Sequence, residues 1–194
     1  MNVIIIVGHP NSKSFNHALA GTCKSQLEEN GHIVVFRDLY VEQFDAVDGI
    51  SNNTNGNDIG QYRSELVNSD GIIVIHPNWW GQPPAIIKGW LDRVFIPEVA
   101  YSICKDDNGN YAPKGLLKAT AAIILNTSNT PDELEEKIYK DPLETIWKNR
   151  VFNFCGVSDF TRRNFQVIKD SDLQQRTIWL TEVKELINKK FPKK

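Results

Sequence analysis

The sequence predicts an α/β protein built on one doubly wound parallel sheet with helices on both faces. Continuous apolar runs such as Val3–Val7 and Ile72–Ile75 are typical of strands that are buried on both sides. Each run is followed by a segment whose apolar residues recur at helical spacing. Because strand and helix patterns alternate along the chain, we expect five parallel strands in a single domain, residues 1–194.

The first strand, Val3–Val7, is followed by a polar loop, Gly8 to Ser14, and then by a helical pattern from Phe15. Backbone N–H groups at the start of this helix and the hydroxyls of Ser12 and Ser14 could hold a phosphate. The loop has neither a GxxxxGK[ST] nor a GxGxxG pattern, which disfavours ATP and a dinucleotide-fingerprint cofactor. Ser14 could equally be a simple helix cap.

The second strand is expected at His32–Phe36, and residues 41–60 predict a long surface loop or lid because they are rich in Asn, Asp and Gly. A short helix over Gln61–Asn68 leads into the third strand, Ile72–Ile75, which His76 and Pro77 should end.

A short aromatic loop, Asn78 to Gln82, separates this third strand from a helix that begins near Pro83-Pro84 and runs to Phe95. Its adjacent Trp79 and Trp80 have two interpretations. They could cap the core from above, or they could form a wall against a flat aromatic ligand. This stretch alone leaves both interpretations open.

The second half of the chain continues the alternation. We expect a hairpin with arms at Ala100–Cys104 and from Tyr111, around a turn at 107–109. A fourth strand at Thr120–Leu125 should be followed by a polar loop at 126–131 and by a helical region at 132–155 that is interrupted near Asp141-Pro142. A fifth strand is expected at Phe160–Ile168, and a closing helix around Trp179–Ile187. In the fifth strand, Arg162 and Arg163 are expected to face solvent.

Polar or aromatic loops follow the first, third and fourth strands. In a sheet of order 2-1-3-4-5 these loops meet at the topological switch point, where that fold holds flavin. Ser and Asn in the first loop suit a phosphate, the tryptophans suit the isoalloxazine ring, and Asn, Thr and Ser in the third loop suit hydrogen bonds to the ring edge. The sequence therefore predicts a flavin site.

Composition narrows the classes of partner. A formal net charge of -2 argues against a nucleic-acid or anionic-membrane partner, and no apolar run is long enough to span a membrane. No secretory signal is visible, and Cys23, Cys104 and Cys155 form no CxxC pair, which fits a reducing cytoplasm. The histidines have no metal-ligand spacing, so we expect no metal site.

Two motifs, GHPNSKSFNHAL at 8–19 and HPNWWGQPPAIIKGWLDRVF at 76–95, resemble the flavodoxin-like NAD(P)H:quinone oxidoreductases. That group includes mammalian quinone reductase, the bacterial modulator of drug activity B and ancillary subunits of potassium-efflux systems; GLLK at 115–118 and FCGV at 154–157 are also similar. The resemblance implies a flavodoxin-like fold and a cytoplasmic homodimeric enzyme with non-covalent FAD, or else FMN. Such an enzyme passes a hydride from NADH or NADPH to a quinone or similar acceptor in a ping-pong cycle.

The resemblance also implies site residues. Those matching the phosphate region are His9, Ser14, Phe15 and Asn16; those beside the ring are Pro77, Asn78, Trp79, Trp80 and Gly81; those in the third loop are Thr127, Ser128 and Asn129. Mammalian members have a Thr-Thr-Gly-Gly run in the third loop, then a Tyr and a His that relay charge. Here Glu133 lies near the Tyr position and Tyr139 near the His position. The relay is therefore not carried over, and Tyr139 is the candidate catalytic substitute.

Two other functions remain as alternatives. A flavodoxin-type electron carrier would present an acidic surface to its partners, which the nearly balanced charge argues against. A regulatory or ancillary flavoprotein subunit of a transport system has a precedent within the resembled group.

Overall fold

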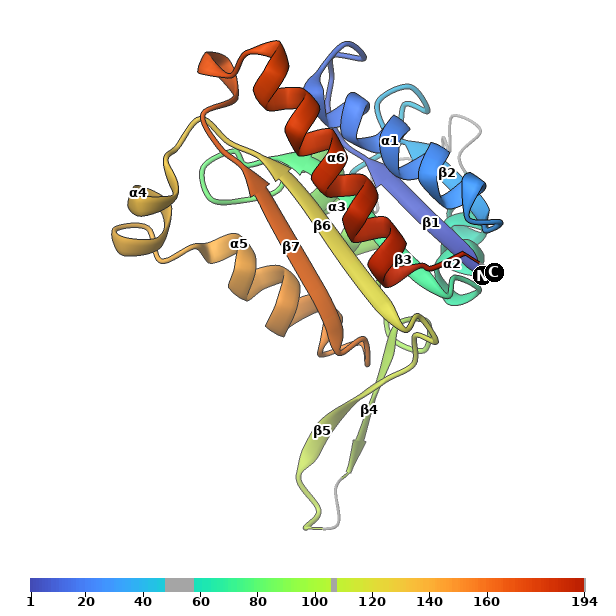
Figure 1. Ribbon diagram of the computed structural model, residues 1–194. Helices are drawn as coiled ribbons and strands as arrows, with labels where there is room; N and C mark the ends of the chain where they lie inside the picture. The colour runs from blue at the N-terminus through green and yellow to red at the C-terminus, as the bar shows by residue number, and fades with distance from the viewer. Residues whose placement is uncertain (48–57, 106–107, 194) are drawn as a thin grey trace.

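The core of the protein is a five-stranded parallel sheet of order β2-β1-β3-β6-β7 (Figure 1). The computed structural model describes residues 1–47, 58–105 and 108–193. The sheet strands are β1 (Asn2–Val7), β2 (Ile33–Asp38), β3 (Gly71–Pro77), β6 (Ala121–Thr127) and β7 (Asp159–Phe165). This order confirms the predicted 2-1-3-4-5 arrangement, with β6 and β7 as the fourth and fifth strands.

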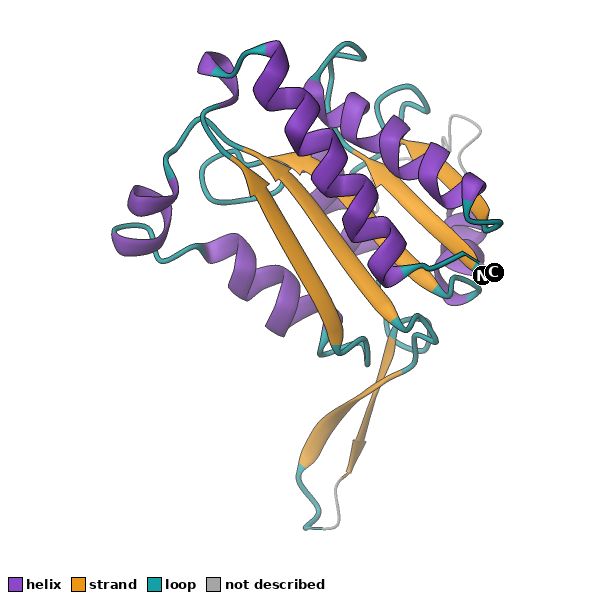
Figure 2. Ribbon diagram, in the orientation of Figure 1, coloured by secondary structure: helices purple, strands orange, loops and turns teal. Residues whose placement is uncertain are grey.

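Helices cover both faces of the sheet, as Figure 2 shows. One face carries α1 (Phe15–Glu29) and α6 (Leu173–Lys190); the other carries α2 (Ile59–Val67), α3 (Ala85–Val94), α5 (Pro142–Thr145) and the π-helix η1 (Ile146–Phe152). Side chains alternate along β1, so Ile5 packs toward α1 and α6 while Ile6 packs toward Trp90 and Trp147. This burial on both faces explains the continuous apolar runs.

The third strand runs through Pro77, two residues beyond the predicted end. Pairing with β1 stops at Val7 opposite Ile75, whereas pairing with β6 continues to Pro77 opposite Thr127. The proline lacks an N–H on the side where β3 no longer has a neighbour, so no ladder bond is lost. The fourth strand likewise extends past Leu125 to Thr127.

A two-stranded hairpin leaves the sheet domain and extends away from it (Figure 1). Its strands β4 (Tyr101–Lys105) and β5 (Tyr111–Gly115) pair antiparallel, as predicted. Residue 107 of the predicted turn lies outside the described residues, as do residues 48–57 of the predicted loop or lid. Among the described residues, no helix combines the length and apolar character needed to cross a membrane.

The last strand differs from its prediction in two ways. It ends at Phe165 rather than Ile168, after which the chain turns into a short 3-10 helix, η2 (Ile168–Asp170). The prediction that Arg162 faces solvent is wrong, because its side chain is 5% exposed and pairs with Asp141. Arg163 is 37% exposed and pairs with Glu182. Alternation sends Arg162 to the face that α5 and η1 cover, which the strand pattern alone does not reveal.

Candidate functional site

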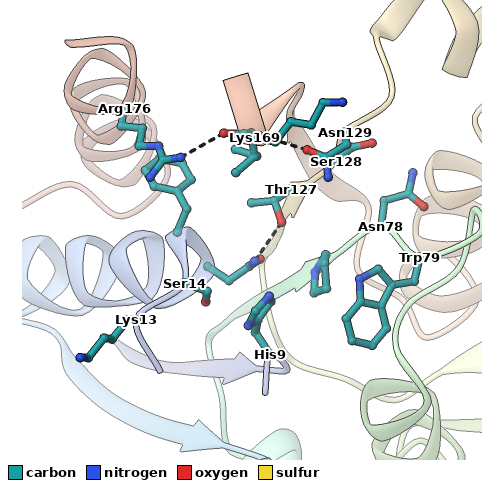
Figure 3. A pocket seen from close by; sticks show the side chains of 14 residues that line it. His9, Lys13, Ser14, Asn78, Trp79, Thr127, Ser128, Asn129, Lys169 and Arg176 are labelled. Atoms are coloured by element: carbon teal, nitrogen blue, oxygen red, sulfur yellow. Dashed lines mark hydrogen bonds between the residues drawn. The ribbon is translucent and has the colours of Figure 1, made fainter. Parts of the chain in front are cut away.

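A cavity of about 340 Å³ lies at the carboxyl ends of β1, β3 and β6 (Figure 3). Of the residues predicted for a flavin site, those that line it are His9, Ser14, Phe15, Asn16, Pro77, Asn78, Trp79, Thr127, Ser128 and Asn129. The cavity therefore lies at the topological switch point, where ligands bind in open α/β sheets.

The first wall of this cavity is the start of α1. The loop before it is folded by Asn11, whose side-chain oxygen accepts from Lys13 N–H at 2.9 Å and whose carbonyl accepts from Ser14 N–H at 3.0 Å. Ser14 caps the helix and also lines the cavity. The first N–H groups of a helix have no intrahelical partner, so those of Phe15 and Asn16 are placed to bind an anion.

Hydrogen bonds connect the three loops to one another. Asn16 Nδ2 donates to Thr127 Oγ1 at 2.9 Å, which ties the first loop to the third (Figure 3). Asn78 N–H donates to the Thr127 carbonyl at 2.7 Å, which ties the second loop to the third. These two hydrogen bonds hold the three loops to one another.

Cationic side chains that sequence reasoning missed also line this cavity: Lys13, Lys169 and Arg176. No carboxylate lines it among the described residues. Lys169 N–H donates to Asn129 Oδ1 at 3.1 Å, and Arg176 donates to the Ile168 carbonyl at 3.0 Å (Figure 3). These bonds bring η2 and the start of α6 to the cavity, and nothing local in the sequence signals that.

The donor set suits the phosphate end of a flavin. Positive charge and helix N-terminal amides suit an anion. The buried Oδ1 of Asn16 has no hydrogen-bond partner in the described structure, and as an acceptor it suits a ligand hydroxyl rather than a phosphate oxygen. Burial lowers the pKa of His9, whose Nδ1 lies 3.1 Å from Asn11 N and 3.3 Å from the Asn11 carbonyl oxygen. In the neutral ring, acceptance from Asn11 N–H leaves the hydrogen on Nε2, where it can donate to a ligand.

A second cavity of about 480 Å³ adjoins the first and shares Asn78 with it. It is lined by Asn78, Trp80, Gly81, Thr130, Glu135, Tyr139 and Pro142. Trp80, Gly81 and Tyr139, which were predicted for the site, therefore lie here and not in the first cavity. Glu135, which sequence reasoning missed, is 3% exposed, and its side chain makes no hydrogen bond or ion pair with the described part of the chain.

The aromatic loop separates the two cavities. Trp79 is 43% exposed and Trp80 is 101% exposed, so the interpretation of Trp80 as a cap on the core is wrong. Asn78 Oδ1 accepts from Gly81 N–H at 2.9 Å, which fixes the turn. Trp80 has φ 58, a left-handed conformation that costs a non-glycine residue roughly 1–2 kcal/mol. Such strain tends to persist where a side chain must be presented for function.

Residues 1–180 match the protein family described as having a flavodoxin-like fold. The chain belongs to this family. A Haemophilus influenzae protein named an uncharacterized NAD(P)H oxidoreductase is 35% identical to this flavodoxin-like chain over 167 residues, covering 82% of it and 80% of that protein. The human protein named ribosyldihydronicotinamide dehydrogenase [quinone] is 26% identical over 181 residues, covering 79% of this chain and 76% of that protein.

A solved structure shares the flavodoxin-like fold with a TM-score of 0.75, although only 17% of its residues are identical. It is the FMN-dependent NADH-azoreductase of Bacillus anthracis in complex with FMN, and the match covers 97% of this chain and 99% of that one. The resemblance to flavodoxin-like quinone oxidoreductases is thus confirmed, and the names of the relatives confirm the expectation of an oxidoreductase enzyme.

In this flavodoxin-like protein, a buried polar network adjoins Pro77, which lines the first cavity. Trp147 Nε1–H donates to His76 Nε2 at 3.0 Å, and His76 Nδ1–H donates to the Pro77 carbonyl at 2.8 Å. Burial lowers the pKa of His76 to about 4, so the ring is neutral near pH 7. Arg162 donates to Asn126 at 2.7 Å and to Asp141 at 2.5 Å, which joins the floor of the site to the segment before α5.

Proposed function

We propose that this protein is a flavin-dependent NAD(P)H:quinone oxidoreductase that moves two electrons as a hydride in a ping-pong cycle. The observation that carries this proposal is a cation-lined cavity, joined at Asn78 to a second cavity with aromatic walls, at the switch point of the sheet. The names of the relatives, which include NAD(P)H oxidoreductase and a quinone-type dehydrogenase, support the same reaction class.

The proposed cofactor is FAD, held without a covalent bond, with FMN as the alternative. FAD comes first because the resembled family mostly carries it, whereas the Bacillus anthracis structure of the same fold holds FMN. Both share a phosphate on the ribityl chain, which the helix start, Lys13 and Arg176 would bind. Extraction of the cofactor and measurement of its mass would decide between them.

When bound, the flavin would supply the redox chemistry, by taking two electrons from NAD(P)H and passing them to the acceptor. The protein orients the reactants and excludes water. Trp79 and Trp80 would flank the ring, and the amides of the second and third loops would face its polar edge. Tyr139 lines the second cavity and is placed to contact a reactant there.

The second cavity is the proposed place for NADH or NADPH and then for the acceptor, a quinone or a similar small molecule. Occupation of one pocket in turn by donor and acceptor is the structural basis of a ping-pong cycle. We also propose that the enzyme is a cytoplasmic homodimer. Light scattering on the eluted protein would test the dimer, and a monomer at working concentration would contradict it.

The proposed function is tested on the purified full chain. We expect a yellow protein that oxidises NADH or NADPH with menadione and gives parallel lines in double-reciprocal plots. A colourless protein that also fails to bind added FAD or FMN would refute the proposal. A protein that binds flavin but reduces no acceptor would instead favour the electron carrier or the ancillary subunit of a transport system.

A further inference from the structure

A chain of hydrogen bonds leads from the wall of the first cavity to the end of β2. Ser14 Oγ lies 2.9 Å from His17 Nδ1, and His17 Nε2 lies 2.8 Å from Asp38 Oδ2. The other carboxylate oxygen of Asp38 accepts from Tyr40 N–H at 3.1 Å and from Val41 N–H at 3.2 Å. With these backbone donors and a ring nitrogen around it, Asp38 acts as an acceptor only, so His17 must carry a hydrogen on Nε2.

With the hydrogen of His17 on Nε2, the neutral ring determines whether Ser14 Oγ can donate a hydrogen bond to a ligand in the cavity. A neutral imidazole has one hydrogen, so Nδ1 holds a lone pair and must accept the hydroxyl hydrogen of Ser14. Ser14 Oγ also accepts from His17 N–H at 3.4 Å as the helix cap. Only a lone pair of Ser14 then remains for the cavity, and a lone pair repels a phosphate oxygen.

Protonation of His17 reverses the polarity of this bond. In the imidazolium form Nδ1–H donates to Ser14 Oγ, which releases the hydroxyl hydrogen to donate into the cavity. In this form the ring also pairs with the Asp38 carboxylate at 2.8 Å, and the new positive charge lies behind a residue that lines the anion site. An anion bound at Ser14 and a proton bound at His17 therefore favour each other.

We propose that His17 is a positioning residue for the phosphate group of the ligand, and that it takes up one proton from solvent as the phosphate binds. The N–H bond at Nδ1 is the one covalent bond that forms, with a proton taken from solvent. The hydroxyl of Ser14 keeps its hydrogen and donates it in a hydrogen bond to a phosphate oxygen instead of to His17. The proposal rests on the proposed flavin as ligand, although inorganic sulfate or phosphate would meet the same chemistry.

The other titratable groups near His17 behave differently. Within the described residues, the ring of His9 faces it edge-on at 6.4 Å between centroids, and Asp38 faces it from β2. His9 Nδ1 accepts from Asn11 N–H, so its Nε2–H can donate to a phosphate without any extra proton. Lys13, Lys169 and Arg176 line the same cavity as cationic side chains. The proposal assigns the proton to His17, and His9, which lines the same cavity, is the matched control.

The test measures the affinity of the flavin-free full chain for FMN and for riboflavin, which lacks the phosphate. Above about pH 7 the phosphate is a dianion throughout, since its second pKa is about 6. Where His17 of the free protein is neutral, we expect the FMN dissociation constant to rise about tenfold per pH unit, while that of riboflavin stays level. Calorimetry in buffers of different ionisation enthalpy should count close to one proton taken up with FMN.

Substitution of each histidine shows which of the two takes up the proton. His17→Gln should remove the pH slope and the proton uptake with FMN, whereas His9→Gln should keep both even if it weakens binding. Riboflavin affinity and circular dichroism would confirm that each variant is folded. An unchanged slope in His17→Gln, or no slope in the wild type, would overturn the proposal while leaving a flavin function intact.

Sulfate binding tests the role of His17 independently of whether the protein binds a flavin. It remains a dianion over the whole range, and its binding can be followed by the imidazole resonances of His17 in NMR spectra. If no flavin binds but sulfate binds with uptake of a proton at His17, the positioning role stands and the flavin function falls. If sulfate and FMN both bind while His17 remains neutral, the positioning role is refuted.

Discussion

The two cavities that meet at Asn78 differ in charge. The first is lined by Lys13, Lys169 and Arg176 and, within the described residues, by no carboxylate. The second has the opposite character, because its charged lining residue is Glu135, beside the aromatic side chains of Trp80 and Tyr139. A ligand with an anionic end and a flat ring therefore fits across the pair in one direction only.

The cavities also differ in what holds them in place. The first is built from strand ends, a helix start and hydrogen bonds between main chains and short side chains. The second depends on residues in left-handed conformations, including Trp80 at φ 58 and Asp141 at φ 41. A residue in such a conformation is kept there by contacts from the surrounding structure, and for Asp141 that contact is the ion pair with Arg162. We therefore expect the second cavity to be the more easily disrupted of the two.

The largest loss of stability is expected when the ion pair between Arg162 and Asp141 is removed. Arg162→Ala leaves Asp141 and Asn126 without their buried donor, and loss of one partner of a buried pair costs about 3–5 kcal/mol. The neighbouring Arg163, which forms a more exposed pair with Glu182, is the matched control; Arg163→Ala should cost at most about 1 kcal/mol. Urea unfolding measures both. Equal losses of unfolding free energy in the two variants would show that the ion pair of Arg162 does not stabilise the structure around the second cavity more than an exposed pair would.

Gly81 offers a smaller and more local disruption. It has φ +71, and an added Cβ would lie 2.7 Å from Cγ of Pro142, which also lines the second cavity. Gly81→Ala should cost about 3 kcal/mol, from the left-handed conformation and from the clash. Gly109 has φ +82 but open space around it, so Gly109→Ala should cost only the conformational part, about 1 kcal/mol. Thermal unfolding that gave the two variants the same loss would contradict the contact with Pro142.

The buried His76, next to Pro77 in the wall of the first cavity, predicts a pH effect. The pKa of His76 falls from 6.5 to about 4 on folding, so the unfolded chain binds this proton more readily than the folded one. The contribution of His76 to stability is complete above pH 6.5 and is lost as the pH falls toward 4. Between about pH 7.5 and about pH 5, we expect the wild type to lose about 2 kcal/mol more than His76→Gln. A parallel pH dependence of the two proteins in urea unfolding would contradict a buried neutral His76.

Much of this arrangement could be predicted from local sequence and some of it could not. Val3–Val7 was predictable because a strand buried on both faces must be apolar throughout. Arg162 was not, because an edge-strand pattern contains no information about the helix that later covers it. Lys169 reaches the first cavity through a bond to Asn129, 40 residues away in the chain, and such contacts leave no local pattern.

The smallest expected effect tests the charge of the second cavity directly. Glu135 lines the second cavity, and its side chain makes no hydrogen bond or ion pair within the described chain, so a cationic ring bound between Trp80 and Tyr139 would have this carboxylate beside it. We expect kcat/KM for the cationic acceptor N-methylphenazinium, relative to neutral menadione, to fall about tenfold in Glu135→Gln, which corresponds to about 1.4 kcal/mol. The acceptor 1,4-naphthoquinone-2-sulfonate, an anion, should change in the opposite direction. Glu133 is the matched control, since it is 73% exposed and already paired with Lys137, and Glu133→Gln should leave all three ratios unchanged. If Glu135→Gln and Glu133→Gln gave the same ratios, the two cavities would differ in lining but not in the charge that a ligand experiences.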